Sequence, residues 1–254
     1  MDLGSFDLNA LLPFIAVGFA AQLVDGALGM AFGVISNTLL VAVLGVPPAL
    51  ASQRVHLVEC FTTATSGISH LLHGNIDKGL FFRLLIPGMI GGVMGAYVLS
   101  SLDAGVVRPF VLLYLAGIGV WLLVRGLLYP PQIKQAKLIA PLGLIGGFLD
   151  AAGGGGWGPV VTSNLLIQGA DPRKVVGTVN SVEFFLTITV SLAFVLHLGL
   201  ADVAGATLGL LIGGVGAAPI GAWAAKRIPP KPMLILVGVV LSATSAFGIY
   251  TAWF

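Results

Sequence analysis

Long apolar segments separated by short polar stretches run through the whole chain. A helix needs about 20 apolar residues to cross a hydrocarbon core about 30 Å thick. The pattern therefore predicts an all-α integral membrane protein in which most apolar segments cross the membrane once. These segments cover roughly residues 11–46, 55–73, 84–101, 106–128, 138–170, 175–198, 203–225 and 233–254.

Two of the segments, 11–46 and 138–170, are too long for a single crossing. Each is interrupted near its middle by an aspartate followed by glycines, at residues 25–33 (the first break) and 150–158 (the second break). A charge and an interrupted helix are both costly inside lipid. We therefore predict two shorter helices in each segment, forming a hairpin that enters and leaves the membrane on the same side.

The lysines and arginines test this arrangement. If every segment crossed once, the basic residues would divide 5 against 7 between the two sides. With hairpins, Arg54 and Arg108 lie on one side and all the others lie on the opposite side. Because basic residues accumulate in cytoplasmic loops, the hairpin arrangement is favoured and both termini are predicted outside the cytoplasm. The residues on the cytoplasmic side are Lys78, Arg83, Arg125, Lys134, Lys137, Arg173, Lys174, Lys226, Arg227 and Lys231.

The two halves of the chain repeat each other. A shift of 125 residues superposes Asp25 on Asp150, and a shift of 124 superposes Glu59 on Glu183. Each half then contains one broken hairpin and three crossings, and an odd number of crossings makes the second copy enter from the opposite side. The prediction is two inverted-topology repeats, residues 1–128 and 138–254, joined by a cytoplasmic linker at 129–137. Inverted repeats with broken helices are typical of secondary transporters, in which the breaks face each other near the membrane centre.

Composition agrees with this architecture and excludes several functions. The chain is 57% hydrophobic and 9% charged, whereas soluble domains carry about 25% charged residues. The single cysteine, Cys60, excludes an internal disulfide, and the small net charge of +2 gives no reason to expect nucleic acid. The glycines at 153, 155 and 158 match a dinucleotide motif, but no strand precedes them. We therefore expect neither an enzyme nor a metal site or cofactor.

The second break is a candidate anion site. A helix that restarts after a break directs its N–H groups and the positive end of its dipole towards an anion. Glycine also leaves the backbone accessible to a ligand. Alternatively, the two aspartates cap the restarted helices, which does not exclude lining a site. The candidates are Gly154, Gly155, Gly156, Trp157 and Gly158 in the second break and Gly29 and Gly33 in the first.

Glu59 and Glu183 form a second matched pair, each in the first full crossing after its hairpin. His56 and Asn180 precede them by three residues and therefore share their helical face. Buried acids in a membrane are candidates for proton relays, and the alternative is a hydrogen-bonded pair between helices. Arg54 has no basic counterpart, so it either attracts an anion or anchors its helix at the interface. The two aspartates and two glutamates would repel an anion at the centre. This favours transport of the anion coupled to a proton or another cation.

The chain resembles the TauE/SafE family of sulfite and organosulfonate permeases. The resemblance rests on Gly-Gly-Gly-Gly-Trp-Gly-Pro at 153–159 with the four residues that follow, and on matching stretches at 66–70, 74–77 and 177–183. It implies a secondary transporter that moves sulfite, sulfoacetate or a related organosulfonate across the bacterial inner membrane, generally as export. The first break lacks the glycine run, which leaves open whether both breaks bind substrate.

Two further expectations remain open. Four buried acids would also suit a carrier for a cation or a neutral small solute, and this is the alternative function. Glycine-rich helix faces are compatible with a homodimer. The expected partners are therefore a small anion, the lipid bilayer, a coupling proton or cation, and a second copy of the chain.

Overall fold

The computed structural model describes residues 8–28, 30, 32–128, 138–162, 164–165, 168, 172–199, 204–224 and 230–253. Every regular element within these ranges is helical, as the apolar pattern predicts. The predicted linker 129–137 and the candidate Gly29 lie outside the described residues.

Helices end and restart within both breaks. The first half contains α1 (Leu8–Leu28), α2 (Phe32–Thr38), the π-helix η1 (Leu39–Val43), α3 (Pro48–Leu72), α4 (Lys78–Ser101) and α5 (Ala104–Leu127). The second half contains α6 (Ile139–Gly153), the π-helix η2 (Trp157–Thr162), α8 (Pro172–Leu198), α9 (Ala204–Ala224) and α10 (Pro230–Trp253). The division of both long segments into two helices is therefore confirmed.

Several of these helices have the length and composition of membrane-embedded helices. In the part of the chain that the structure describes, three stretches are long and apolar enough to cross a membrane, Lys78–Ser101, Pro109–Leu127 and Lys174–Leu198. Shorter apolar stretches include Leu11–Gly26, Phe32–Val43, Ile139–Gly153 and Thr207–Ala218. The two divided segments fall in the shorter class because each break separates one apolar run into two.

Helices α3 and α8 begin earlier than the apolar segments 55–73 and 175–198. Each starts at a proline, which suits the first turn of a helix because its missing N–H would have no helical partner there. The first turns of α3 carry Ser52 and Gln53, which are polar yet buried. Hydropathy misses this part of the helix because its polar side chains face other helices.

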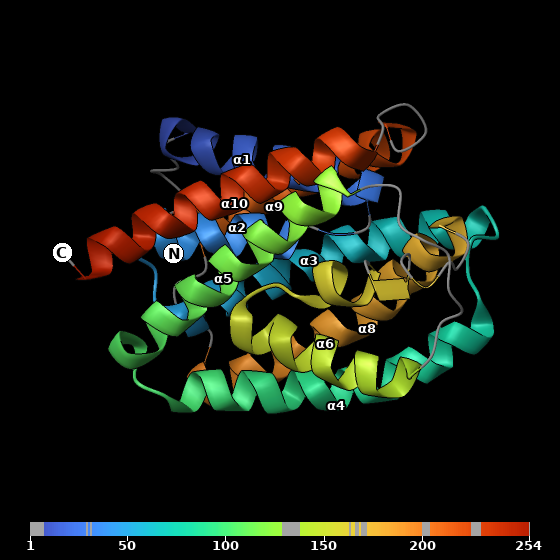
Figure 1. Cartoon of the computed structure of the whole chain (residues 1–254), viewed down its shortest axis with the longest axis horizontal. Helices are drawn as coiled ribbons and strands as arrows, with labels where there is room; N and C mark the ends of the chain where they lie inside the picture. The colour runs from blue at the N-terminus through green and yellow to red at the C-terminus, as the bar shows by residue number, and fades with distance from the viewer. Residues whose placement is uncertain are drawn as a thin grey trace.

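The helices pack in four principal pairs: α1 along α9, α6 along α4, α3 along α8, and α5 along α10. Figure 1 shows α4 and α6 side by side at one edge of the molecule, with α1 at the opposite edge. Glycines bring two of the pairs to backbone contact. A Cβ at Gly91 of α4 would lie 2.0 Å from the Leu144 oxygen of α6, and one at Gly213 of α9 would lie 2.0 Å from the Ile15 oxygen of α1.

Polar and apolar side chains are distributed as a lipid environment requires. Large apolar side chains on the outer helices are exposed, among them Phe82, Phe110 and Phe247. Polar side chains of α3 and α8 are buried instead, including His56 and Asn180. Since a polar group in lipid is costly, the interior of the bundle is where such groups are tolerated.

Candidate functional site

The four predicted central acids are buried within the bundle. Glu183 of α8 interacts electrostatically with the other three, and Glu59 of α3 interacts with both aspartates. The structure therefore brings acids from both halves of the chain into one polar centre. The exposed fractions are 6% for Asp25, 4% for Glu59, 2% for Asp150 and 6% for Glu183.

The two breaks lie in contact with each other at this centre. Gly155 has a φ of +130°, which L side chains rarely adopt, and a Cβ there would lie 2.4 Å from the Val34 nitrogen of α2. A Cβ at Gly33 would lie 3.2 Å from the Gly155 Cα and 2.9 Å from Glu59 Oε1. Glycines in both breaks therefore permit the backbones to touch beside a buried glutamate.

Asp150 caps the helix that restarts after the second break. Its Oδ1 accepts hydrogen bonds from the N–H of Gly156 (2.8 Å) and of Trp157 (3.0 Å), while its main-chain oxygen accepts from Gly155 (2.8 Å). A carboxylate in this position satisfies N–H groups that have no partner within the helix. The N–H of Gly154 also donates to the Asp150 main-chain oxygen, so in this conformation four N–H groups of the predicted anion site donate to Asp150. All five candidates from Gly154 to Gly158 are buried.

Asp25 caps the restarted helix of the first break in a similar way. Its Oδ1 accepts from the N–H of Phe32, seven residues later, which is the spacing between Asp150 and Trp157. The distance is 3.4 Å, longer than either Oδ1 contact of Asp150. In both breaks an aspartate thus caps the restarted helix, but the capping hydrogen bond is longer in the first break than in the second.

His56 of α3 reaches across to Asp150, with its Nε2 3.0 Å from Asp150 Oδ2. The other ring nitrogen, Nδ1, lies 2.7 Å from the main-chain oxygen of Ser52, one turn earlier. Ser52 Oγ also donates to the Ala151 oxygen at 2.9 Å, which ties α3 to the end of α6. The sequence prediction missed Ser52, although its position four residues before His56 places it on the same helical face.

Two further polar side chains that were not predicted hold the second break. The Tyr114 hydroxyl of α5 donates to the Gly155 oxygen at 3.2 Å, and the Asn37 amide of α2 donates to the Gly153 oxygen at 3.4 Å. Asn37 belongs to the first half of the chain, so it links the two halves directly. The sequence did carry a signal for both residues: each is a polar side chain inside an apolar segment rather than at its end.

Asn180, the counterpart of His56 in the second half, makes a different contact. Its amide nitrogen donates to Ser66 Oγ of α3 at 2.9 Å. Among the described residues, Asn180 Oδ1 and Glu183 Oε2 are buried oxygens without a hydrogen-bond partner. The α8 side of the centre therefore presents acceptor oxygens, whereas the α3 side presents the His56 ring.

The two remaining predicted site residues are Trp157, whose main-chain N–H donates to Asp150, and Arg54. The Trp157 ring is fully buried and donates its Nε1–H to the Val179 oxygen of α8 at 3.2 Å. Arg54 is half-buried on α3. Two residues correspond to about 200° around a helix, so Arg54 projects from a different side of α3 than His56. The structure thus brings the acids and His56 together, whereas Arg54 projects from another side of α3 than His56.

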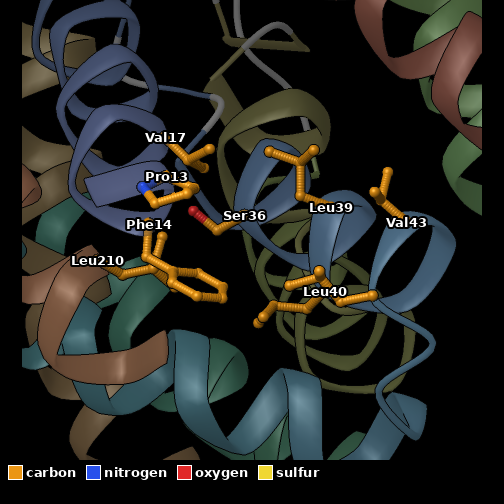
Figure 2. Close-up of a pocket in the computed structure, with 9 residues that line it drawn as sticks. Pro13, Phe14, Val17, Ser36, Leu39, Leu40, Val43 and Leu210 are labelled. Carbon is orange, nitrogen blue, oxygen red and sulfur yellow. The ribbon is translucent and has the colours of Figure 1, made fainter. Parts of the chain in front are cut away.

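A cavity of about 140 Å³ lies between α1, η1 and α9 (Figure 2). Ser36 contributes the polar lining side chain, and none of the predicted site residues borders the cavity. An apolar cavity of this kind suits hydrocarbon rather than an anion. The lining residues are Pro13, Phe14, Val17, Ser36, Leu39, Leu40, Val43, Leu44 and Leu210.

Comparison with known proteins extends over nearly the whole chain. The model of the family described as "Sulfite exporter TauE/SafE" matches residues 14–247, which include both breaks and all four central acids. The chain is also similar to the protein named "Probable membrane transporter protein YtnM" of Bacillus subtilis (strain 168). The two are 43% identical over 255 residues, which cover 97% of this chain and 85% of the relative. No solved structure gives a significant match.

Proposed function

Because the chain belongs to the TauE/SafE family and is a multi-pass membrane transporter, we propose that its substrate is a small sulfur-containing oxyanion. Sulfite, sulfoacetate or a related organosulfonate crosses the bacterial inner membrane, in the direction of export. The observation that carries the proposal is the buried polar centre where the two breaks meet. Ionisable groups inside a membrane protein commonly mark a substrate or ion pathway.

Proton coupling is part of this proposal. The N–H groups of Gly156 and Trp157 donate to Asp150 in the conformation described here. An anion reaches them only when the Asp150 side chain turns away. Protonation of central acids also reduces the repulsion that an anion would meet there. Binding of a proton therefore removes negative charge from the centre that the anion must enter.

The two halves are proposed to be inverted repeats, with both termini outside the cytoplasm. The packing supports this relation: exchanging the halves converts the α1–α9 pair into the α6–α4 pair and returns α3–α8 and α5–α10 to themselves. A membrane-impermeant thiol reagent tests the topology in a variant with Cys60→Ser and a new cysteine at the C-terminus. Labelling of intact spheroplasts is expected, and labelling only after lysis would contradict the topology.

Flux measurements in proteoliposomes test the substrate and the coupling together. Radiolabelled sulfite, sulfoacetate, sulfate and a panel of cations would be supplied under imposed pH gradients. We expect Asp150→Asn and Glu183→Gln to abolish transport or to uncouple it from the gradient, while both variants still insert into the membrane. Normal pH-dependent transport by both variants would contradict proton coupling.

A carrier for a cation or a neutral solute is the second candidate function. The unpartnered oxygens of Asn180 and Glu183 favour it, because buried acceptors suit a cation or a hydrogen-bond donor. The same flux panel separates the two candidates. Movement of a cation without movement of any sulfur oxyanion would replace the first proposal with the second.

A further inference from the structure

We propose that His56 and Asp150 together form the proton-binding site of this transporter, and that they share one proton in the conformation described here. The inference rests on the proposed function for its role in transport, but the presence of the proton can be tested separately. It assigns His56, which the sequence placed on the same helical face as Glu59, to proton binding. The two side chains are 0% and 2% exposed.

The hydrogen bonds of the His56 ring determine where its protons lie. Nδ1 is 2.7 Å from the main-chain oxygen of Ser52. A carbonyl oxygen can only accept a hydrogen bond, so Nδ1 carries a proton. Nε2 is 3.0 Å from Asp150 Oδ2, a distance at which two lone pairs would repel each other. A proton therefore lies between them. Whether it is bonded to Nε2 or to Oδ2, the pair has no net charge.

Loss of this proton changes both the charge and the connections of the second break. The proton passes from Nε2 or Oδ2 to a water molecule and leaves a neutral imidazole beside a carboxylate, with a net charge of −1. The hydrogen bond between His56 and Asp150 is then lost, while Ser52 can still donate to Ala151 and Asp150 Oδ1 can still cap Gly156 and Trp157. The neutral pair tolerates a nearby anion and the charged pair repels it. Proton and anion are thus carried together.

Other titratable groups surround the pair and must be considered in any pH measurement. On α3, Glu59 interacts electrostatically with His56, and on α8, Glu183 interacts with Asp150. From α5, Tyr114 interacts with Asp150, and from α1, Asp25 interacts with Glu59. The Phe194 ring of α8 also lies beside the imidazole, with its centroid 6.2 Å from that of His56.

The other half of the chain has no equivalent pair. Asn180 occupies the position that corresponds to His56, and its amide donates to Ser66 Oγ. An amide does not titrate, so proton-dependent closure belongs to the second break alone. This difference gives a physical reason for the unequal breaks: one carries the proton-binding pair, and the other contributes acids to the centre.

Hydrogen–deuterium exchange of the full-length protein in lipid nanodiscs tests the inference without any substrate. Exchange of residues 150–162 would be followed between about pH 6 and about pH 11, a range that extends well above ordinary histidine titration because the buried carboxylate stabilises the shared proton, and corrected for chemical exchange rates. In the wild type, protection of this segment is expected to fall as pH rises, because the pair loses its proton. The expected loss is about tenfold, the effect of one charge-assisted hydrogen bond.

Two variants assign the effect to His56. His56→Gln can donate to Asp150 but cannot titrate, so protection of residues 150–162 should no longer depend on pH. His73→Gln replaces an exposed histidine at the end of the same helix and should behave as the wild type. Retained pH dependence in His56→Gln would overturn the inference.

The wild-type measurement keeps the test decisive even if His56→Gln fails to fold. A segment 150–162 whose protection does not change with pH would overturn the inference by itself. Failure of the proposed function has a different signature, namely no flux of any sulfur oxyanion through the wild type. Such a result would remove the transport role of the pair but would not alter the exchange experiment.

Discussion

Replacing Asp150 by alanine should destabilise the protein far more than the same change at Asp25. The Asp150 carboxylate accepts from two main-chain N–H groups and lies beside His56 Nε2, whereas the described part of the chain gives the Asp25 carboxylate one bond, at 3.4 Å. Both aspartates are almost fully buried. Removing either side chain therefore leaves its donors without a partner and with little access to water.

The size of the difference follows from the number of donors. A buried donor left without a partner costs about 1–3 kcal/mol, so the two main-chain donors at Asp150 cost roughly 2–6 kcal/mol, to which the lost contact with His56 adds. The one bond of the Asp25 carboxylate within the described residues, at 3.4 Å, corresponds to about 1 kcal/mol on the same scale. Asp150→Asn should lie between the two alanine variants, because its amide oxygen can still accept from Gly156 and Trp157.

The free energy of unfolding of the three variants can be compared by titrating sodium dodecyl sulfate into detergent micelles. In a background whose other three tryptophans are replaced by phenylalanine, fluorescence of Trp157, which is fully buried within the second break, reports local opening, and circular dichroism reports loss of helix. The order of stability is expected to be Asp25→Ala, then Asp150→Asn, then Asp150→Ala as the least stable. Equal destabilisation by the two alanine variants would refute the reasoning that Asp150 closes its break more tightly.

Two further predictions test the packing around the centre. Gly155→Ala places a Cβ 2.4 Å from the Val34 nitrogen at a φ of +130°, so the yield of folded protein in size-exclusion chromatography should collapse; a normal yield would contradict the contact between the breaks. A Cβ at Gly67 would lie 3.9 Å from the Ser181 Cβ, close to the mean separation in disulfides. Cysteines at both positions, in a Cys60→Ser background, should therefore crosslink on mild oxidation, whereas either single cysteine should give no intramolecular crosslink.

Much of the candidate site was predictable because a membrane leaves few reasons for a buried charge. Asp25, Asp150, Glu59 and Glu183 are acids inside apolar segments, and the structure buries them all. The glycines of the second break likewise marked an interrupted helix, and α6 ends at Gly153. These features depend on local sequence and on the cost of polarity in lipid, and both can be read without a structure.

The contacts among these residues could not be predicted in the same way. His56 and Asp150 are separated by 94 residues, and only the packing of α3 against α6 brings their side chains together. Symmetry alone would have given Asn180 a matching contact in the first break, yet its amide donates to Ser66 Oγ. The repeat predicted which positions are equivalent, but side-chain chemistry and the neighbouring helix decided what each one binds.

The sequence by itself determined that this is a helical membrane protein with two interrupted segments and acids in its interior. Those conclusions follow from segment length and from the penalty for charge in hydrocarbon, which act along the chain. Only the tertiary structure decided that Asp150 fills its own helix terminus and meets His56, and that Asn37 and Tyr114 hold the second break. Hydrogen bonds depend on distances of about 3 Å between residues far apart in sequence, and such distances are set by helix packing.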